Sequence, residues 1–269
     1  MHRYLEVVPP ETTILEAAKR MKEKNLGSLL VESTDAEGRM SNSSGIVTET
    51  DLVRKVLAKE IDPSRTMVDQ VMTSPLLTIA SDASMLDASH LMNTNYVRYL
   101  CVSEQDEIVG IISMRDLARY FVDSAGGPVH DLDNIYQPLS VLMHRTMGTM
   151  ASERTILEAA QMMAEKRIGS LLVIEAEEMV GIVTEANMVR KGMAPHLPAN
   201  STSVGTIMNY PLIQIDINRT VRDASRLMAE EQIRHLPVTE DNKVVGILSL
   251  RDLVKMVSVR DKPRFLRQT

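Results

Sequence analysis

The fold is decided by the stretch Gly45-Ile46-Val47-Thr48-Glu49-Thr50-Asp51-Leu52, where an apolar run ends at a hydroxyl residue and a carboxylate follows three positions later. Three more copies of this pattern follow: Gly110-Ile-Ile-Ser-Met-Arg-Asp-Leu117, Gly181-Ile-Val-Thr-Glu-Ala-Asn-Met188 and Gly246-Ile-Leu-Ser-Leu-Arg-Asp-Leu253. Their glycines are spaced by 65, 71 and 65 residues, so the 269-residue chain consists of two pairs of repeats joined by a connector.

The four copies fall into two kinds. Copies one and three share Thr-Ile-Leu-Glu-Ala-Ala, beginning at Thr13 and Thr155, and Gly-Ser-Leu-Leu-Val, beginning at Gly27 and Gly169. Copies two and four share Arg-x-Leu-x-Val, beginning at Arg98 and Arg234. This pattern indicates an ancestral two-repeat unit that duplicated as a whole.

Each copy predicts the order strand, helix, strand, strand, helix. The first helix starts with a capping box in copies one and three, and its apolar residues recur at the spacing of one helix face. That face consists of Ile14, Ala17, Ala18 and Met21 in copy one, and of Ile156, Ala159, Ala160 and Met163 in copy three. The strand after this helix is predicted at residues 26–31, 98–102, 168–174 and 234–238. A unit of about 60 residues buries little surface alone, so we expect the copies to pack face to face within each half.

The repeat spacing divides the chain into domains. The copies occupy residues 1–58, 65–123, 139–194 and 201–258, with a connector at 124–138 and a basic tail at 259–269. Copy one has six additional residues within the polar stretch 32–44, which predicts a surface loop.

Composition excludes several functional classes. The net charge is −6, there is no Trp, and there are two Phe, so we expect neither a nucleic-acid surface nor membrane binding. No apolar run approaches the length of a membrane span, and the first ten residues lack a signal peptide's apolar stretch, so we expect a cytoplasmic protein. Cys101 reads as a core strand residue, and the histidines show no metal-ligand spacing, so no metal is expected. No catalytic motif is present, so we expect no enzyme.

The motif itself permits two interpretations. Thr48 and Asp51 have the spacing of a capping box, which satisfies the free N–H groups of a helix start. A hydroxyl, a carboxylate and a helix N-terminus together also make a sugar-phosphate site, because the helix start attracts phosphate and the carboxylate accepts ribose hydroxyls.

A strand-helix-strand-strand-helix unit that ends in Gly-h-h-Thr/Ser-x-x-Asp, with h apolar, resembles the cystathionine β-synthase (CBS) domain, and four copies cover nearly the whole chain. The organisation is similar to that of the gamma subunit of AMP-activated protein kinase. The resemblance implies an α+β fold of four units in two pseudo-twofold tandem pairs, packed as a disc, with clefts for adenosine-containing ligands.

The resemblance also implies site residues. Ribose and phosphate roles are expected at Thr48, Asp51, Ser113, Asp116, Thr184, Asn187, Ser249 and Asp252. Asn187 replaces the carboxylate in copy three, so we expect weaker binding there. Phosphate contacts are expected from Arg98, Arg115, Arg234 and Arg251, and close backbone approach at Gly27 and Gly169.

The function predicted on this basis is a non-catalytic sensor that transmits ligand occupancy to an unidentified partner protein. A homodimer through the repeat pairs is a further expectation. AMP, ADP, ATP, S-adenosylmethionine, NAD and cyclic di-adenosine phosphate all fit this chemistry. One alternative is a structural adaptor with vestigial clefts. Another is weak nucleic-acid binding through the basic tail.

Overall fold

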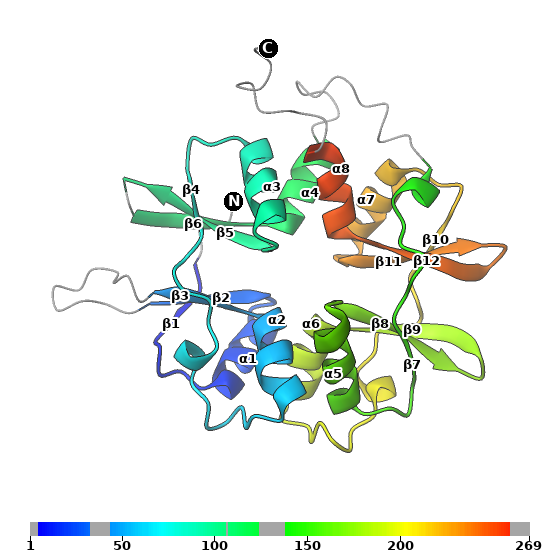
Figure 1. Ribbon diagram of the computed structural model, residues 1–269, viewed down its shortest axis with the longest axis horizontal. Coiled ribbons are helices and arrows are strands. Elements are labelled where there is room, and N and C mark those ends of the chain that lie inside the picture. Colours follow the sequence, from blue (N-terminus) through cyan, green and yellow to red (C-terminus); the bar gives the residue numbers. More distant parts are fainter. Residues whose placement is uncertain (1–4, 33–43, 106, 124–137, 259–269) are drawn as a thin grey trace, which may run out of the picture. The chain divides into compact units, whose positions relative to one another are not determined.

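The computed structural model describes residues 5–32, 44–105, 107–123 and 138–258 (Figure 1). The described residues form a mixed α+β fold in which the order strand, helix, strand, strand, helix occurs four times, as predicted. The basic tail lies outside the described residues, and so do the connector except Pro138 and the predicted surface loop of copy one except Glu32 and Ser44.

Each copy builds its own three-stranded sheet. The first strand runs parallel to the second, because a helix connects them, and the second and third form an antiparallel hairpin. The strands of copies one and two are β1 (Val7–Val8), β2 (Ser28–Val31), β3 (Gly45–Thr48), β4 (Thr78–Ala80), β5 (Tyr99–Glu104) and β6 (Glu107–Ser113). Those of copies three and four are β7 (Thr149–Ala151), β8 (Ser170–Glu175), β9 (Glu178–Thr184), β10 (Ile215–Asp216), β11 (His235–Glu240) and β12 (Lys243–Ser249).

The first helix of each copy connects its first two strands. These helices are α1 (Ile14–Glu23), α3 (Met85–Thr94), α5 (Ile156–Lys166) and α7 (Val221–Glu230). Both predicted capping boxes are confirmed at Thr13 and Thr155, and two more occur at Ser84 and Thr220. All eight residues of the two predicted apolar faces are buried, so the helical periodicity identified the core correctly.

The second helix follows the motif, and its form differs between the two kinds of copy. In copies two and four it is a regular α-helix, α4 (Met114–Asp123) and α8 (Leu250–Ser258). In copies one and three only one α-helical turn forms, α2 (Glu49–Asp51) and α6 (Glu185–Asn187), and a π-helix follows at Leu52–Val56 and Met188–Met193. A π-helix widens the backbone locally and is frequent at functional sites. Sequence periodicity did not predict this difference.

The copies are grouped into two compact units, each with one copy from either half of the chain. Of the described residues, the first unit consists of 78–105, 107–123, 138–147 and 213–258, which contain most of copies two and four. The second unit consists of 5–32, 44–77 and 148–212, which contain most of copies one and three. Within each unit the helices of the two copies pack against each other. The sequence predicted that copy one packs on copy two and copy three on copy four. The members of these pairs belong to different units, so this packing stays a prediction.

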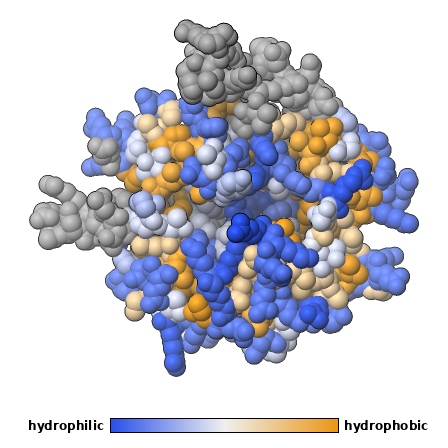
Figure 2. All heavy atoms as spheres, in the orientation of Figure 1, coloured by the Kyte–Doolittle hydropathy of each residue, from blue (hydrophilic) through white to orange (hydrophobic). Residues whose placement is uncertain are grey.

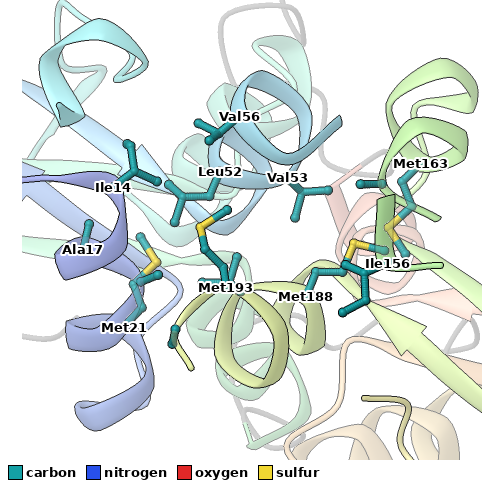
Figure 3. Close-up of a cluster of buried hydrophobic side chains, with 14 of the residues drawn as sticks. Ile14, Ala17, Met21, Leu52, Val53, Val56, Ile156, Met163, Met188 and Met193 are labelled. Atoms are coloured by element: carbon teal, nitrogen blue, oxygen red, sulfur yellow. The ribbon is translucent and has the colours of Figure 1, made fainter. Parts of the chain in front are cut away.

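The second unit has one continuous core to which both copies contribute (Figure 3). Leu52, Val53 and Met188 are completely buried, and Met193 is 3% exposed. Met193 of copy three lies next to Leu52 and Met21 of copy one (Figure 3). Since these side chains come from both copies, neither copy buries its helical face without the other.

Cys101 lies in β5, between β4 and β6, and is buried, which confirms its place in the core. Burial raises the pKa of the Cys101 thiol to about 11, because the thiolate loses its hydration there. The thiol therefore stays protonated near neutral pH.

The outer surface carries hydrophilic and hydrophobic residues side by side. On the face seen in Figure 2, hydrophobic residues lie in small groups among hydrophilic ones, as on ordinary water-exposed surfaces. Of the described helices, none has the length and hydrophobicity needed to cross a bilayer.

Candidate ligand sites

The motif closes a capping box in all four copies. The motif hydroxyl donates a hydrogen bond of 2.5 to 2.7 Å to the side-chain oxygen three residues later. That same oxygen accepts the backbone N–H of the hydroxyl residue at 2.8 to 3.0 Å. The four pairs are Thr48 with Asp51, Ser113 with Asp116, Thr184 with Asn187, and Ser249 with Asp252. The structure therefore brings together each predicted ribose pair at a helix start.

The second oxygen of the carboxylate has its own partner. Asp51 Oδ1 lies 2.7 Å from Lys55 Nζ, and Asp252 Oδ1 lies 2.9 Å from His144 Nε2. A carboxylate oxygen has two lone pairs, so each Oδ1 retains one acceptor site after this contact. The capping box and a ribose contact are therefore compatible at Asp51 and Asp252.

Copy three has different chemistry at this position. Asn187 Oδ1 already accepts both bonds from Thr184, and Asn187 Nδ2 donates to Asn209 Oδ1 at 2.9 Å. Lys191 Nζ also donates to Asn209 Oδ1 at 2.9 Å, and burial lowers the pKa of Lys191. Asn187 therefore has an N–H donor, Nδ2, at the position where Asp51 and Asp252 have the acceptor oxygen Oδ1. The expectation that Asn187 accepts a ribose hydroxyl does not fit this orientation.

A backbone bond ties the start of the second strand to the motif. The N–H group that follows the motif hydroxyl donates to a carbonyl at 2.9 to 3.1 Å. The accepting carbonyls belong to Gly27, Arg98, Gly169 and Arg234 in the four copies. Arg98 and Arg234 therefore lie beside their motif helices, where a phosphate at the helix start would be within the range of a long cationic side chain.

Arg115 and Arg251 make contacts across the first unit. Arg115 Nη2 donates to the carbonyl of Gln232 at 3.3 Å, and Arg251 Nη2 donates to the carbonyl of Tyr96 at 3.2 Å. The Arg251 guanidinium also lies 5.9 Å from the centre of the Tyr96 ring. Both arginines thus have a structural role that the sequence did not reveal, and their predicted phosphate role stays a prediction.

Sequence reasoning missed a methionine that packs on the motif glycine. A Cβ added at Gly45 would lie 2.6 Å from Met72 Sδ and 2.8 Å from the carbonyl oxygen of Thr73. The pairs Gly181 with Met208 and Gly246 with Met143 repeat this arrangement at 2.7 and 2.8 Å. The signal was present in the sequence, because each methionine ends an apolar-x-x-apolar-Met segment, at 68–72, 139–143 and 204–208.

The residue after each methionine lies at the motif. Thr73 and Asn209 form backbone bridges to Ile46 and Ile182, and His144 forms one to Ile247. His144 and Asn209 are the residues that contact Asp252 and Asn187. Close packing against protein atoms thus occurs at the motif glycines Gly45, Gly181 and Gly246. The close approach to a ligand predicted for Gly27 and Gly169 stays a prediction.

The Gly45→Ala substitution is expected to lower the free energy of unfolding by about 1–3 kcal/mol, because the new methyl group collides with a fixed backbone oxygen. Gly192→Ala is the control, since its nearest neighbour is the flexible end of Ile156 at 3.3 Å. Denaturant unfolding of both variants measures the difference. An equal effect at both positions would contradict the assigned contact.

Among the described residues, no group of three or more His, Cys, Asp or Glu side chains is arranged to hold a metal ion.

Comparison with known proteins identifies the family of this chain. The model of the CBS domain matches residues 1–58, 68–123, 140–193 and 204–259. The CBS domain-containing protein CBSCBSPB5 of Arabidopsis thaliana is 24% identical over 279 residues, covering 90% of this chain and 50% of that protein. An uncharacterised 17.7 kDa protein of Acidianus ambivalens is 40% identical over 118 residues, covering 44% of this chain and 67% of that protein. The chain spans about half the length of the Arabidopsis relatives it matches.

Solved structures support the same fold. Protein MJ1225 of Methanocaldococcus jannaschii, a candidate archaeal homologue of g-AMPK, matches with a TM-score of 0.76 at 18% identity, covering 95% of this chain and 97% of that one. An uncharacterised protein of Pyrococcus horikoshii matches with a TM-score of 0.62, covering 96% and 97%. With four matches of the family model that together cover most of its residues, this chain belongs to the CBS domain family, as a protein of four CBS units.

Proposed function

We propose that this protein is a non-catalytic regulatory sensor that binds adenosine-containing ligands at its motif helices and transmits their presence to a partner protein. CBS-domain tandem proteins are generally regulatory, and the fold of this chain matches one of them over nearly its whole length. The observation that carries the proposal is the repeated site, in which a hydroxyl and a carboxylate oxygen lie at a helix start.

The proposed contacts follow from the chemistry of each group. Asp51, Asp116 and Asp252 would accept ribose hydroxyls, and the helix starts at Thr48, Ser113 and Ser249 would face phosphate. Arg98 and Arg234 would supply the cations that a phosphate needs. Thr184 and Asn187 form the weakest candidate site, because the Asn187 amide presents a donor.

The ligand class is adenosine-containing. AMP, ADP, ATP, S-adenosylmethionine, NAD and cyclic di-adenosine phosphate are the candidates that a binding screen should cover. The partner protein, a homodimer through CBS pairs and a cytoplasmic location are further parts of this proposal. Nucleic-acid binding through residues 259–269 is the weaker alternative.

A structural adaptor is the second candidate function, and one observation favours it. The motif side chains already have structural roles, since all four close a capping box and Asp51 and Asp252 also hold Lys55 and His144. In an adaptor the motif residues would serve only to stabilise the fold through these bonds, and no ligand would bind.

A thermal-shift screen over the six candidate ligands separates the two functions. A ligand that binds one site at 100 times its dissociation constant adds about 2.7 kcal/mol of stability. For a chain of this size that corresponds to a rise in melting temperature of about 5–10 °C. The control is inorganic triphosphate, which supplies the charge without the nucleoside. No rise with any of the six ligands at millimolar concentration would favour the adaptor.

A further inference from the structure

Two buried ion pairs cross between copy one and copy three. Glu49 and Glu185 directly follow the motif threonines and are 0% and 1% exposed. Arg190 of copy three donates to Glu49 Oε1 from Nε at 3.0 Å and from Nη2 at 2.9 Å. Arg54 of copy one lies with its Nη2 3.2 Å from Glu185 Oε1. Each copy therefore contributes one carboxylate and one guanidinium to the interface.

The same residues make matching contacts with the opposite backbone. Arg190 Nη2 donates to the carbonyl of Leu26 at 3.2 Å, and Arg54 Nη2 donates to the carbonyl of Ile168 at 3.4 Å. Leu26 and Ile168 occupy corresponding positions, two residues before β2 and β8. The interface is therefore pseudo-symmetric in its charges as well as in its fold.

Copies two and four close the corresponding interface without carboxylates. The residues after their motif serines are Met114 and Leu250, which are 4% and 5% exposed. The positions that correspond to Arg54 and Arg190 hold Arg119 and Lys255, which are exposed. Since this chain packs one such interface with apolar residues, the fold itself does not require Glu49 and Glu185.

Buried ion pairs add little stability compared with apolar residues of similar size, but breaking one is costly. A mixed interface would break one. If copy one packed on copy four, Glu49 would meet Lys255 in the place of Arg190. Arg54 would meet Leu250 in the place of Glu185 and would lose its carboxylate. The observed pairing has two carboxylates and two guanidinium groups.

We propose that Glu49, Arg54, Glu185 and Arg190 form a recognition surface that selects the partner copy. This surface accepts a copy that carries the same Glu and Arg pair, and it rejects copies two and four. The four residues thus determine that copy one packs with copy three in the folded chain.

Charge exchange in the 269-residue chain tests whether the ion pair between Glu49 and Arg190 is formed. Glu49→Arg and Arg190→Glu alone are each expected to lower the folded-to-unfolded ratio at least about 100-fold, because each leaves like charges buried together. The double variant restores the opposite charges and is expected to recover most of this loss. The control is Arg65→Glu, whose ion pair with Asp62 is exposed, so little change is expected. Unchanged stability in both single variants, or no recovery in the double variant, would overturn the proposal.

A second experiment tests selection itself. The variant Glu49→Leu/Arg54→Met/Glu185→Leu/Arg190→Met replaces all four charged residues of this surface by apolar ones, and we expect it to fold with undiminished stability. After unfolding and refolding, wild-type protein is expected to return to one species in size-exclusion chromatography with light scattering. The fourfold variant is expected to give several species, including oligomers in which copies of different chains have paired.

Recovery of a single species of wild-type mass by the fourfold variant would overturn the proposal, and so would several species from the wild type. If the fourfold variant does not fold, the charge-exchange variants decide. The Glu49→Arg variant should then refold to several species, and the double variant Glu49→Arg/Arg190→Glu should refold to one. Any other distribution of species would contradict the proposal.

Discussion

Leu52→Ala is expected to lower the free energy of unfolding of the second unit by about 2–5 kcal/mol. Leu52 is completely buried and lies in the core that copies one and three share (Figure 3). Removing its side chain loses the transfer free energy of the buried methyl groups and leaves a cavity that close-packed neighbours fill only in part.

Met188 occupies the corresponding position in copy three and is also completely buried. Because both side chains belong to one core, Met188→Ala is expected to destabilise the same unfolding transition by a comparable amount. Met67→Ala is the matched control in the same unit, since Met67 is 41% exposed and its removal should change stability by less than about 0.5 kcal/mol. Separate transitions for the Leu52 and Met188 variants in urea unfolding would contradict a shared core.

Asp51→Ala, Asp116→Ala and Asp252→Ala are each expected to weaken ligand binding at their own site by roughly ten- to a hundredfold. A charge-assisted hydrogen bond to ribose contributes about 1.5–3 kcal/mol compared with a neutral replacement, which corresponds to that change in affinity. Calorimetric titration of the single variants, well below their melting temperatures, measures the loss site by site.

Copy three supplies the matched control. Asn187→Ala is expected to change affinity much less, because Asn187 offers no free oxygen to a ligand. Asn187→Asp is expected to tighten the site, with Lys191 placed to hold the new carboxylate as Lys55 holds Asp51.

The capping interpretation predicts a different result. If these side chains only cap their helices, the Asp→Ala variants lose about 0.5–2 kcal/mol of stability while the folded protein binds ligand with unchanged affinity. Equal affinities across all the variants would contradict the ribose assignment.

The sequence predicted the architecture of each copy because that architecture depends on local patterns. The capping box at Thr13 and the face Ile14, Ala17, Ala18 and Met21 are set by neighbours within two helical turns. Repetition of the pattern four times then made the family resemblance specific. The π-helix at Leu52–Val56 was not predicted, because its apolar residues also fit an ordinary helix.

Contacts between distant segments were harder to predict. The likeness of copies one and three was interpreted as ancestry, yet these are also the copies whose helices share a core. Glu49 and Arg190 lie 141 residues apart, and nothing local to either indicates the other. Met143 packs on Gly246 and His144 contacts Asp252, although residues 139–194 were assigned to copy three and this motif belongs to copy four.

Native mass spectrometry of the 269-residue chain tests the proposed function most directly, because it counts bound ligands on intact chains. The protein is measured as purified and after addition of each of the six adenosine ligands. The proposal predicts at least one adenosine-containing ligand per chain, with fewer bound in the Asp51→Ala variant at the same ligand concentration. A spectrum that shows only the mass of the unliganded chain, with every ligand at millimolar concentration, would contradict it.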